Sequence, residues 1–374
     1  MRNSPFPGFD GLRLAAAISV LFSHAFLIAE GREDGEPLRY LLGPGNIIGL
    51  YGVFTFFAIS GFLLTRSLDN GAEAVQFSIN RALRIVPGFL FCIVATSLLI
   101  GAAVTPLSLW DYYTQPDTYA YVWSSLACLC DSWEGSFRFG THPAVTDLKN
   151  GSLWSLSYEA LSYLFLLWLW MLLRRPFLVA GVAGFAALIS ALNPHASQIM
   201  PGIAYTLPYF SGGVVMYVVY QRFGTTLLLA WLSLGFICAS ALVGFQQYAF
   251  AIFGSYILVF LAERSNIGSR FAQRCGDLSY GAYLFGWPME QLVQHFVGFY
   301  NGWQLFALSL PIVFACAAIS WWVIEKPCLK LKELSPRLLS RSVLESQLGQ
   351  TLGIERQRDE DMVHPRSSST SHPS

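Results

Sequence analysis

The sequence predicts an all-α protein, a polytopic bundle of about ten transmembrane helices. Composition supports this, because 54% of the 374 residues are hydrophobic and only 12% are charged. Soluble domains contain about a quarter charged residues, twice this share. Apolar runs of about 20 residues, the length one helix needs to cross a bilayer, also recur along the chain. The zero formal net charge argues against a strongly basic nucleic-acid-binding protein.

The apolar runs follow one another along most of the chain, with polar loops between them. Each is compatible with one membrane crossing, although the fifth and the eighth are short. We expect spans near residues 12–29, 47–65, 85–104, 152–173, 177–193, 201–220, 225–243, 248–263, 277–296 and 303–324. No internal repeat of the kind that builds many transporters is evident in the sequence.

Basic residues are distributed unequally between the two sets of loops. Fifteen Lys and Arg fall on the side of the N-terminus, and four fall on the opposite side: Arg32, Arg39, Arg138 and Lys149. Because basic residues accumulate in cytoplasmic loops, both termini are predicted to be cytoplasmic.

The chain is predicted to contain one folded membrane domain and one tail. Residues 1–332 make up the membrane domain, and residues 333–374 form a polar, Ser-rich cytoplasmic tail that we expect to be disordered. Residues 105–151 form the one long outer loop, which is rich in Trp, Tyr and acidic residues. These aromatics could hold sugars, but an interfacial aromatic belt is the simpler interpretation for most of them.

The stretch Phe9–Phe26 carries polar residues within a predicted span. Arg13 and His24 are 11 residues apart, which on a helix is three turns plus about 20°, so both project from one face. Asp10 lies about 40° from the same stripe. Asp10 and Arg13 could be interfacial anchors, with His24 a hydrogen-bonded core residue. The alignment instead favours a functional stripe that faces the protein interior.

Glu159, in the fourth predicted span, is a candidate partner for His24. At 1.5 Å per residue, Glu159 is about 10 Å and His24 about 8 Å below the outer surface. A carboxylate beside an imidazole orients the ring and fixes its tautomer. The alternative is a hydrogen bond between helices that serves packing only. The pairing also requires the first and fourth spans to be neighbours.

Two further pairs lie nearer the cytoplasmic side. Arg81 and Arg84 are three residues apart at the mouth of the third span, so on a helix they share a face. Paired guanidiniums suit phosphate binding, although the positive-inside rule explains such residues equally well. Ser60 and Gly61 lie in the second span, where a small residue admits a ligand or a neighbouring backbone. The seven cysteines show no paired ligand spacing, so we expect no metal site.

Six sequence blocks, in order, resemble the membrane acyltransferase-3 family of sugar and polysaccharide O-acetyltransferases. They are FDGLRLAAAISVLFSH with Arg13 and His24, GVFTFFAISGFLL with Ser60 and Gly61, RALR with Arg81 and Arg84, WSLSYE with Trp154 and Glu159, GDLSYGAYLFGWP with Ser279 and Tyr283, and VIEKP. The resemblance covers residues 9–327 and is to the stand-alone form, without an esterase-type domain after the last span. In one departure, Gly286 stands where many members have His.

The resemblance implies an O-acyltransferase of the bacterial cytoplasmic (inner) membrane. It implies cytoplasmic acyl-CoA, most often acetyl-CoA, as co-substrate, with no permanently bound cofactor. The acceptor is expected to be a hydroxyl of a surface or lipid-linked carbohydrate on the extracytoplasmic side. The alternative is a membrane transporter or exporter of a polar solute or glycan precursor, which would move its solute without CoA.

The resemblance also implies roles for the residues singled out above. We expect His24 to act as general base on the acceptor hydroxyl, with Glu159 orienting it and Arg13 positioning the acyl arm. A covalent acyl-histidine relay is an open alternative to direct transfer. The residues expected to bind the donor are Arg81, Arg84, Ser60 and Gly61, and those expected to support the site are Asp10, Trp154, Ser279 and Tyr283.

Overall fold

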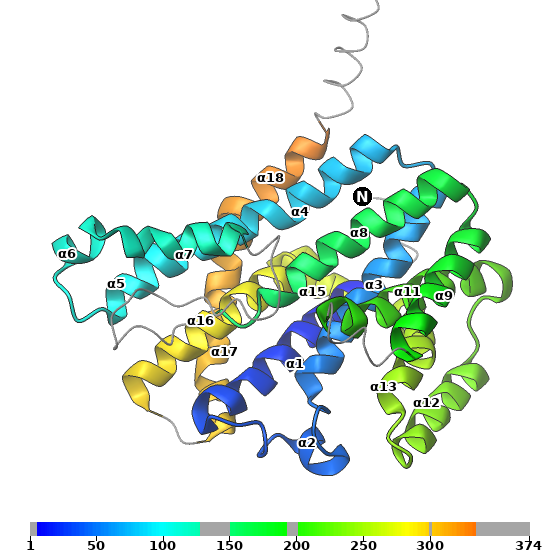
Figure 1. Ribbon diagram of the computed structural model, residues 1–374, viewed down its shortest axis with the longest axis horizontal. Helices are drawn as coiled ribbons and strands as arrows, with labels where there is room; N and C mark the ends of the chain where they lie inside the picture. Colours follow the sequence, from blue (N-terminus) through cyan, green and yellow to red (C-terminus); the bar gives the residue numbers. More distant parts are fainter. Residues whose placement is uncertain (1–5, 128–149, 193–200, 299–300, 334–374) are drawn as a thin grey trace, which may run out of the picture.

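The computed structural model describes residues 6–127, 150–192, 201–298 and 301–333, and every regular element within these ranges is helical (Figure 1). The first half contains α1 (Phe9–Glu30), α2 (Pro37–Leu42), α3 (Ile48–Asp69), α4 (Ala74–Ala95), η1 (Thr96–Ile100), α5 (Gly101–Val104), α6 (Leu109–Thr114), α7 (Pro116–Ala127), α8 (Trp154–Leu173) and α9 (Pro176–Leu192). The second half contains α11 (Pro201–Phe223), α12 (Leu227–Ala241), α13 (Gln246–Ala249), η2 (Phe250–Gly254), α14 (Ser255–Arg264), α15 (Ile267–Cys275), α16 (Ser279–Val297), α17 (Gly302–Ile319), η3 (Ser320–Glu325), α18 (Lys326–Lys330) and η4 (Leu331–Glu333). The predicted tail from residue 334 onward lies outside the described residues, as does 128–149 of the predicted outer loop.

Within the described ranges, six helical segments are long and apolar enough to cross a bilayer. They are Phe9–Glu30, Ile48–Asp69, Ala74–Val104, Trp154–Leu173, Gly202–Phe223 and Gly302–Lys330. Two shorter apolar helices, Pro176–Leu192 and Leu227–Ala241, occupy the fifth and seventh predicted spans. The eighth and ninth predicted spans are also largely helical but are not among the six. The all-helical fold is therefore confirmed, with six candidate membrane-spanning segments among the described residues, whereas the count of ten spans and the side of the termini stay predictions.

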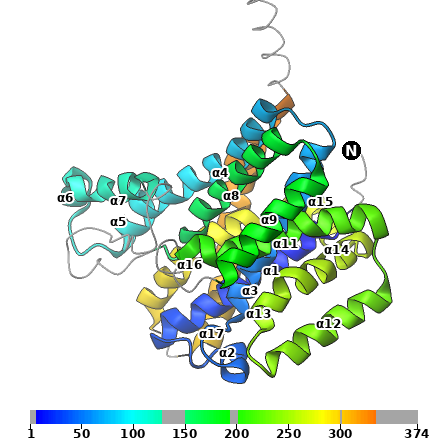
Figure 2. The same cartoon turned by 45° about the vertical axis from the view of Figure 1, so that its right-hand side comes forward.

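The interior of the bundle is formed around α1 and α3, which lie side by side in both views (Figures 1 and 2). α1 also packs against α16 and α17, and α3 packs against α11. Helices farther out expose large apolar side chains, for example Leu228 and Trp231 of α12, which are 68% and 64% exposed. Such side chains suit a lipid-facing surface, because the hydrocarbon solvates them as well as a protein core does.

The contact between α3 and α11 shows what packs against Gly61. A Cβ atom at Gly61 would lie 2.0 Å from the carbonyl oxygen of Phe210, and one at Gly213 would lie 2.0 Å from that of Ala58. The two glycines thus let the two backbones approach closely. Gly61 is not among the residues that line the arginine cavity described below, and its expected role in donor binding stays a prediction.

The segment that follows α5 projects from one side of the bundle as α6 and α7 (Figure 1). Its tyrosines are bound back to the end of the preceding helix. The hydroxyl groups of Tyr112 and Tyr113 donate to the carbonyl oxygens of Ser97 and Leu98, at 2.6 and 2.8 Å. These two aromatic rings therefore anchor the projecting segment.

Candidate active site

Two cavities lie in succession along the bundle, both bordered by α1, α3, α8 and α16. The first, which we call the arginine cavity, has a volume of about 330 Å³. Its charged and hydroxyl-bearing lining residues are Arg13, Ser60, Arg81, Arg84, Ser155, Glu159, Tyr163, Asp277, Ser279, Tyr280, Tyr283 and Lys332. The second, the histidine cavity, has a volume of about 390 Å³. Its polar and aromatic lining residues are Ser23, His24, Glu33, Trp154, Tyr205, Tyr283 and Trp287.

Two carboxylates hold Arg84 in the lining of the arginine cavity. Its guanidinium nitrogens lie 2.5 Å from an oxygen of Asp277 and 3.8 Å from an oxygen of Glu325. Asp277 in turn accepts hydrogen bonds from the hydroxyl and the backbone N–H of Ser279, at 2.6 and 3.3 Å. A buried charge is costly unless it is paired. This ion-pair cluster therefore holds the Arg84 side chain in a fixed place in the lining of the cavity.

Glu325 reaches Arg84 because the last long helix changes its winding. Residues Ser320–Glu325 form η3, a π-helical stretch that holds one residue more per turn than an α-helix would. The Ser320 hydroxyl donates to Glu325 at 2.8 Å and orients the carboxylate. The same stretch brings Trp321 into the cavity lining, with the Arg84 guanidinium carbon 5.8 Å from the centre of its ring. That distance is within the range of a cation–π contact.

Arg13 and Arg81 face the same cavity without such partners. Within the described part of the chain, neither makes a direct ion pair, and the Nε of Arg81 is buried without a hydrogen-bond partner. The lining therefore holds four basic side chains, the fourth being Lys332, against the two carboxylates of Glu159 and Asp277. This excess of positive charge suits a ligand that carries several phosphate groups.

Glu159 belongs to the arginine cavity. Its carboxylate accepts hydrogen bonds from the hydroxyl groups of Tyr163 and Ser60, the latter at 3.5 Å. The two hydroxyl groups are themselves 3.4 Å apart. Glu159 is also close enough to Arg13 and Arg81 for their positive charges to act on it. The carboxylate thus belongs to a polar cluster beside the unpaired arginines.

His24 lines the other cavity, where its ring packs edge-to-face against Trp287 with the ring centres 4.6 Å apart. The Nδ1 atom of His24 and the Nε1 atom of Trp287 are buried and have no hydrogen-bond partner among the described residues. Buried polar atoms are normally paired. His24 and Trp287 both line this cavity, so the lining contains an imidazole and an indole, each with a polar atom whose hydrogen-bonding capacity is unused among the described residues.

The expected pairing of His24 with Glu159 is not found. The two residues line different cavities, and Glu159 is bonded to Tyr163 and Ser60. α8 packs against α3, α9 and α11, whereas α1 packs against α3, α16 and α17, so α3 lies between the two helices in question. Because the two cavities lie in succession along the bundle, the two side chains also lie at different levels, and the equal depth expected from the sequence is not found.

A buried glutamate binds the segment after α1 to the lining of the histidine cavity. Glu36 is fully buried and accepts hydrogen bonds from the hydroxyl of Ser23 and the backbone N–H groups of Arg39 and Ile48, at 3.2, 2.9 and 2.8 Å. Ser23 in turn accepts from the N–H of Gly49 at 2.7 Å. The carboxylate thus joins the starts of α2 and α3 to the residue that precedes His24.

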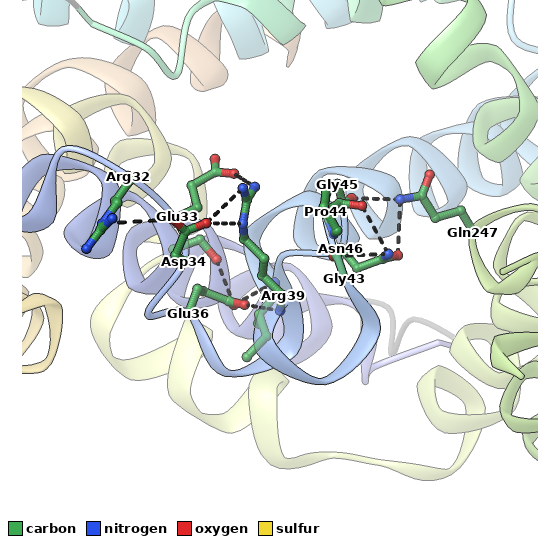
Figure 3. A network of polar contacts seen from close by, with 12 residues as sticks. Arg32, Glu33, Asp34, Glu36, Arg39, Gly43, Pro44, Gly45, Asn46 and Gln247 are labelled. Carbon is green, nitrogen blue, oxygen red and sulfur yellow. Dashed lines mark hydrogen bonds and ion pairs between the residues drawn. The ribbon is translucent and has the colours of Figure 1, made fainter.

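A second set of contacts extends this network outward (Figure 3). Arg39 pairs with Glu33 and Asp34, each at 3.0 Å. On the other side, the Gln247 side chain donates to the carbonyl of Gly45 at 2.7 Å and to Asn46 at 3.2 Å. These contacts hold Glu33, which lines the histidine cavity, in a fixed place.

The remaining predicted residues divide between the two cavities. Ser279 lines the arginine cavity, Trp154 the histidine cavity, and Tyr283 both. Asp10 lines neither, but it lies within electrostatic range of Arg13 and Asp277. It therefore belongs to the charged surroundings of the arginine cavity.

Several lining residues escaped the sequence analysis. Tyr163 follows Glu159 by four residues, the spacing at which helix side chains meet, so it could have been found. Trp287 similarly follows Tyr283 by four residues. No local sequence signal indicates that Lys332 or Glu33 lines a cavity.

Comparison with known proteins assigns the chain to a family. The family model described as an acyltransferase domain matches residues 6–325. Nodulation protein 10 of Rhizobium leguminosarum bv. viciae is 28% identical over 357 residues, which cover 87% of this chain and 93% of that protein. The O-acetyl transferase of Shigella phage Sf6 is 27% identical over 356 residues, covering 88% and 97%.

A third relative is matched over part of its length. The putative peptidoglycan O-acetyltransferase YrhL of Bacillus subtilis (strain 168) is 28% identical over 208 residues, which cover 53% of this chain and 28% of that protein. No solved structure matches the chain. Since the family model covers nearly all of the described helices, the chain belongs to the acyltransferase-3 family of membrane proteins.

Proposed function

We propose that this protein transfers an acetyl group from cytoplasmic acetyl-CoA, across the membrane, to a hydroxyl group of a carbohydrate. The observation that carries the proposal is the succession of two unlike cavities, one cationic and one lined by His24 and aromatic rings. Family membership and the names of two relatives, an O-acetyl transferase and a putative peptidoglycan O-acetyltransferase, support the same reaction class.

The arginine cavity is the proposed donor site. CoA is a polyanion, and guanidinium groups bind phosphate through paired, charge-assisted hydrogen bonds. Arg81 and Arg13 are the arginines free to do so, since Arg84 is already occupied by Asp277 and Glu325. The predicted cytoplasmic position of Arg81 and Arg84 supports this assignment, because acyl-CoA is available on that side.

The histidine cavity is the proposed acceptor site. Trp154, Trp287 and Tyr205 provide aromatic faces for the apolar face of a sugar ring, and Glu33 provides a hydrogen-bond acceptor. A neutral imidazole at His24 accepts the proton of the attacking hydroxyl as that oxygen bonds to the acyl carbon. Trp287, packed against the ring, keeps the imidazole facing the cavity.

Transfer in inside-out membrane vesicles tests the proposal. Vesicles from cells that make the surface glycan receive labelled acetyl-CoA on their exposed, cytoplasmic face. We expect base-labile label in the lumenal carbohydrate only when the protein is present. A transporter would instead move a carbohydrate precursor across the membrane at the same rate without acetyl-CoA, and that outcome would contradict the proposal.

Replacing Arg81 by glutamine should weaken donor binding. Loss of one charge-assisted contact costs about 1.5–3 kcal/mol, so the KM for acetyl-CoA should rise about tenfold or more. The matched control is Arg222→Gln, on the exposed last turn of α11, which should leave the KM unchanged. Equal effects of the two substitutions would argue against a phosphate contact at Arg81.

Lys332 should make donor binding depend on pH. Burial, together with repulsion from Arg81 and Arg84, lowers the pKa of this lysine from 10.5 to about 8. Its positive charge is present below that pH and is lost above it, so the KM for acetyl-CoA should rise between pH 7 and pH 9. Steady-state kinetics across this range should show a flat KM for Lys332→Arg, because a guanidinium stays charged. If the KM of Lys332→Arg rises with pH as much as that of the wild type, another group is responsible for the pH dependence.

A further inference from the structure

Along α3, the change from one cavity to the other takes place at a single residue. Leu50 lines only the histidine cavity, Phe57 lines only the arginine cavity, and Val53 lines both. Leu50 and Phe57 are seven residues apart, which is about 10 Å along a helix axis. The change from one space to the other therefore takes place within about two turns of α3, with Val53 between them.

The same change occurs on α16 and at the beginning of α8. On α16, Tyr280 lines the arginine cavity, Trp287 the histidine cavity, and Tyr283 both. On α8, the change falls between Trp154, in the histidine cavity, and Ser155, in the arginine cavity. The boundary between the two cavities thus lies at one level on three helices. At this level, a single layer of side chains separates the cavities.

Val53 and Tyr283 are the two described residues that line both cavities, and we call this pair the wall. Both are well buried, with 5% and 6% of their surface exposed. The hydroxyl of Tyr283 is 2.6 Å from that of Ser155, and its ring packs edge-to-face on Phe56 with the ring centres 5.6 Å apart. Tyr283 is therefore held in place from two sides, whereas Val53 is a small apolar residue in the same layer.

We propose that the acyl group is transferred at this wall and that Val53 limits the length of the acyl chain. The inference rests on the proposed function, since it takes the arginine cavity as the donor site and the histidine cavity as the acceptor site. At the wall, the acceptor oxygen forms a bond to the acyl carbon and the carbon–sulfur bond of the thioester breaks. The hydroxyl proton passes to His24, and the CoA thiolate leaves with the electron pair of the broken bond and is then protonated.

The thickness of the wall determines which acyl groups fit. The acyl carbon must be reached from the histidine cavity while the sulfur remains in the arginine cavity, so the rest of the acyl group lies within the layer itself. A methyl group is small enough for that position, but each further methylene has to displace Val53 or Tyr283. In a shaped apolar site, one methylene changes the rate about 10- to 200-fold.

Competition between two thioesters tests the inference in one sample. Inside-out vesicles that contain the native glycan receive equal amounts of acetyl-CoA and butyryl-CoA, and mass spectrometry gives the ratio of the two esters on the carbohydrate. We expect the wild type to transfer almost only acetyl. Val53→Ala, which removes two methyl groups from the wall, should raise the butyryl-to-acetyl ratio at least tenfold. Misfolded protein does not affect the ratio, because it makes neither product.

Two control variants make the result specific to the wall. Val20→Ala is the same substitution at a residue that lines only the histidine cavity, and it should leave the ratio unchanged. Val53→Thr keeps the volume of the side chain and should also leave the ratio unchanged. An unchanged ratio in Val53→Ala, an equal rise in Val20→Ala, or ready butyryl transfer by the wild type would each overturn the inference while the proposed function stands. A wild type that transfers neither acyl group would overturn the proposed function, and the inference with it.

Discussion

Replacing Arg84 by methionine should destabilise the protein by about 3 kcal/mol or more. The substitution leaves Asp277 and Glu325, whose side chains are 19% and 2% exposed, without their buried cation. Removing one partner of a buried ion pair typically costs about 3–5 kcal/mol, because the other charge remains desolvated. Thermal unfolding of the purified protein in detergent measures the loss.

A double variant separates the ion pair from simple packing. In Arg84→Met with Asp277→Asn, the stranded charge of Asp277 is removed, so the loss should be smaller than in the single Arg84 variant by about 1 kcal/mol or more. Arg270→Met, an exposed arginine of α15, is the matched control and should change stability by no more than about 0.5 kcal/mol. If the double variant is less stable than Arg84→Met alone, the cluster is not held by this pair.

Replacing His24 by alanine should reduce acetyl transfer about 10²- to 10⁴-fold, the usual contribution of a general base. The loss should fall on kcat, while the KM for acetyl-CoA stays near its wild-type value, because His24 lies outside the arginine cavity. The vesicle assay at several acetyl-CoA concentrations separates the two constants.

His295, the exposed histidine near the end of α16, provides the control for His24. His295→Ala should transfer acetyl groups at the wild-type rate. Wild-type kcat in a correctly inserted His24→Ala variant would exclude a base or relay role for this residue. A rise in KM alone would instead assign His24 to donor binding.

The helical part of the fold follows directly from local sequence. Long apolar runs in a chain with few charges have little alternative in a bilayer, because a helix satisfies its own backbone hydrogen bonds. The stripe on the first span was also predictable, since helix geometry alone aligns Arg13 with His24. Both side chains face the interior, Arg13 the arginine cavity and His24 the histidine cavity.

Contacts between helices could not be predicted in the same way. The position of a residue along its span gives its depth, which led to the pairing of Glu159 with His24. That estimate depends on where each span begins, and Glu159 and His24 in fact line different, successive cavities. Depth also leaves the order of helices within the membrane plane open, and α3 lies between α1 and α8. Gly61 illustrates the same limit, because the sequence shows that something approaches closely there but not that it is the backbone at Phe210.

The π-helical winding of η3 makes the number of residues in this stretch part of the site itself. Elsewhere along the chain, loops between helices can lose or gain residues without moving what they connect. Between α17 and α18, the loss of one residue within η3 would restore regular α-helical winding, because the π-helical stretch accommodates its extra residue within its own turn. The segment that carries Lys332 would keep its orientation, but the winding that brings Trp321 and Glu325 to Arg84 would be lost. Relatives that bind the donor in the same way should therefore tolerate changes of residue in Ser320–Glu325 more readily than changes of its length.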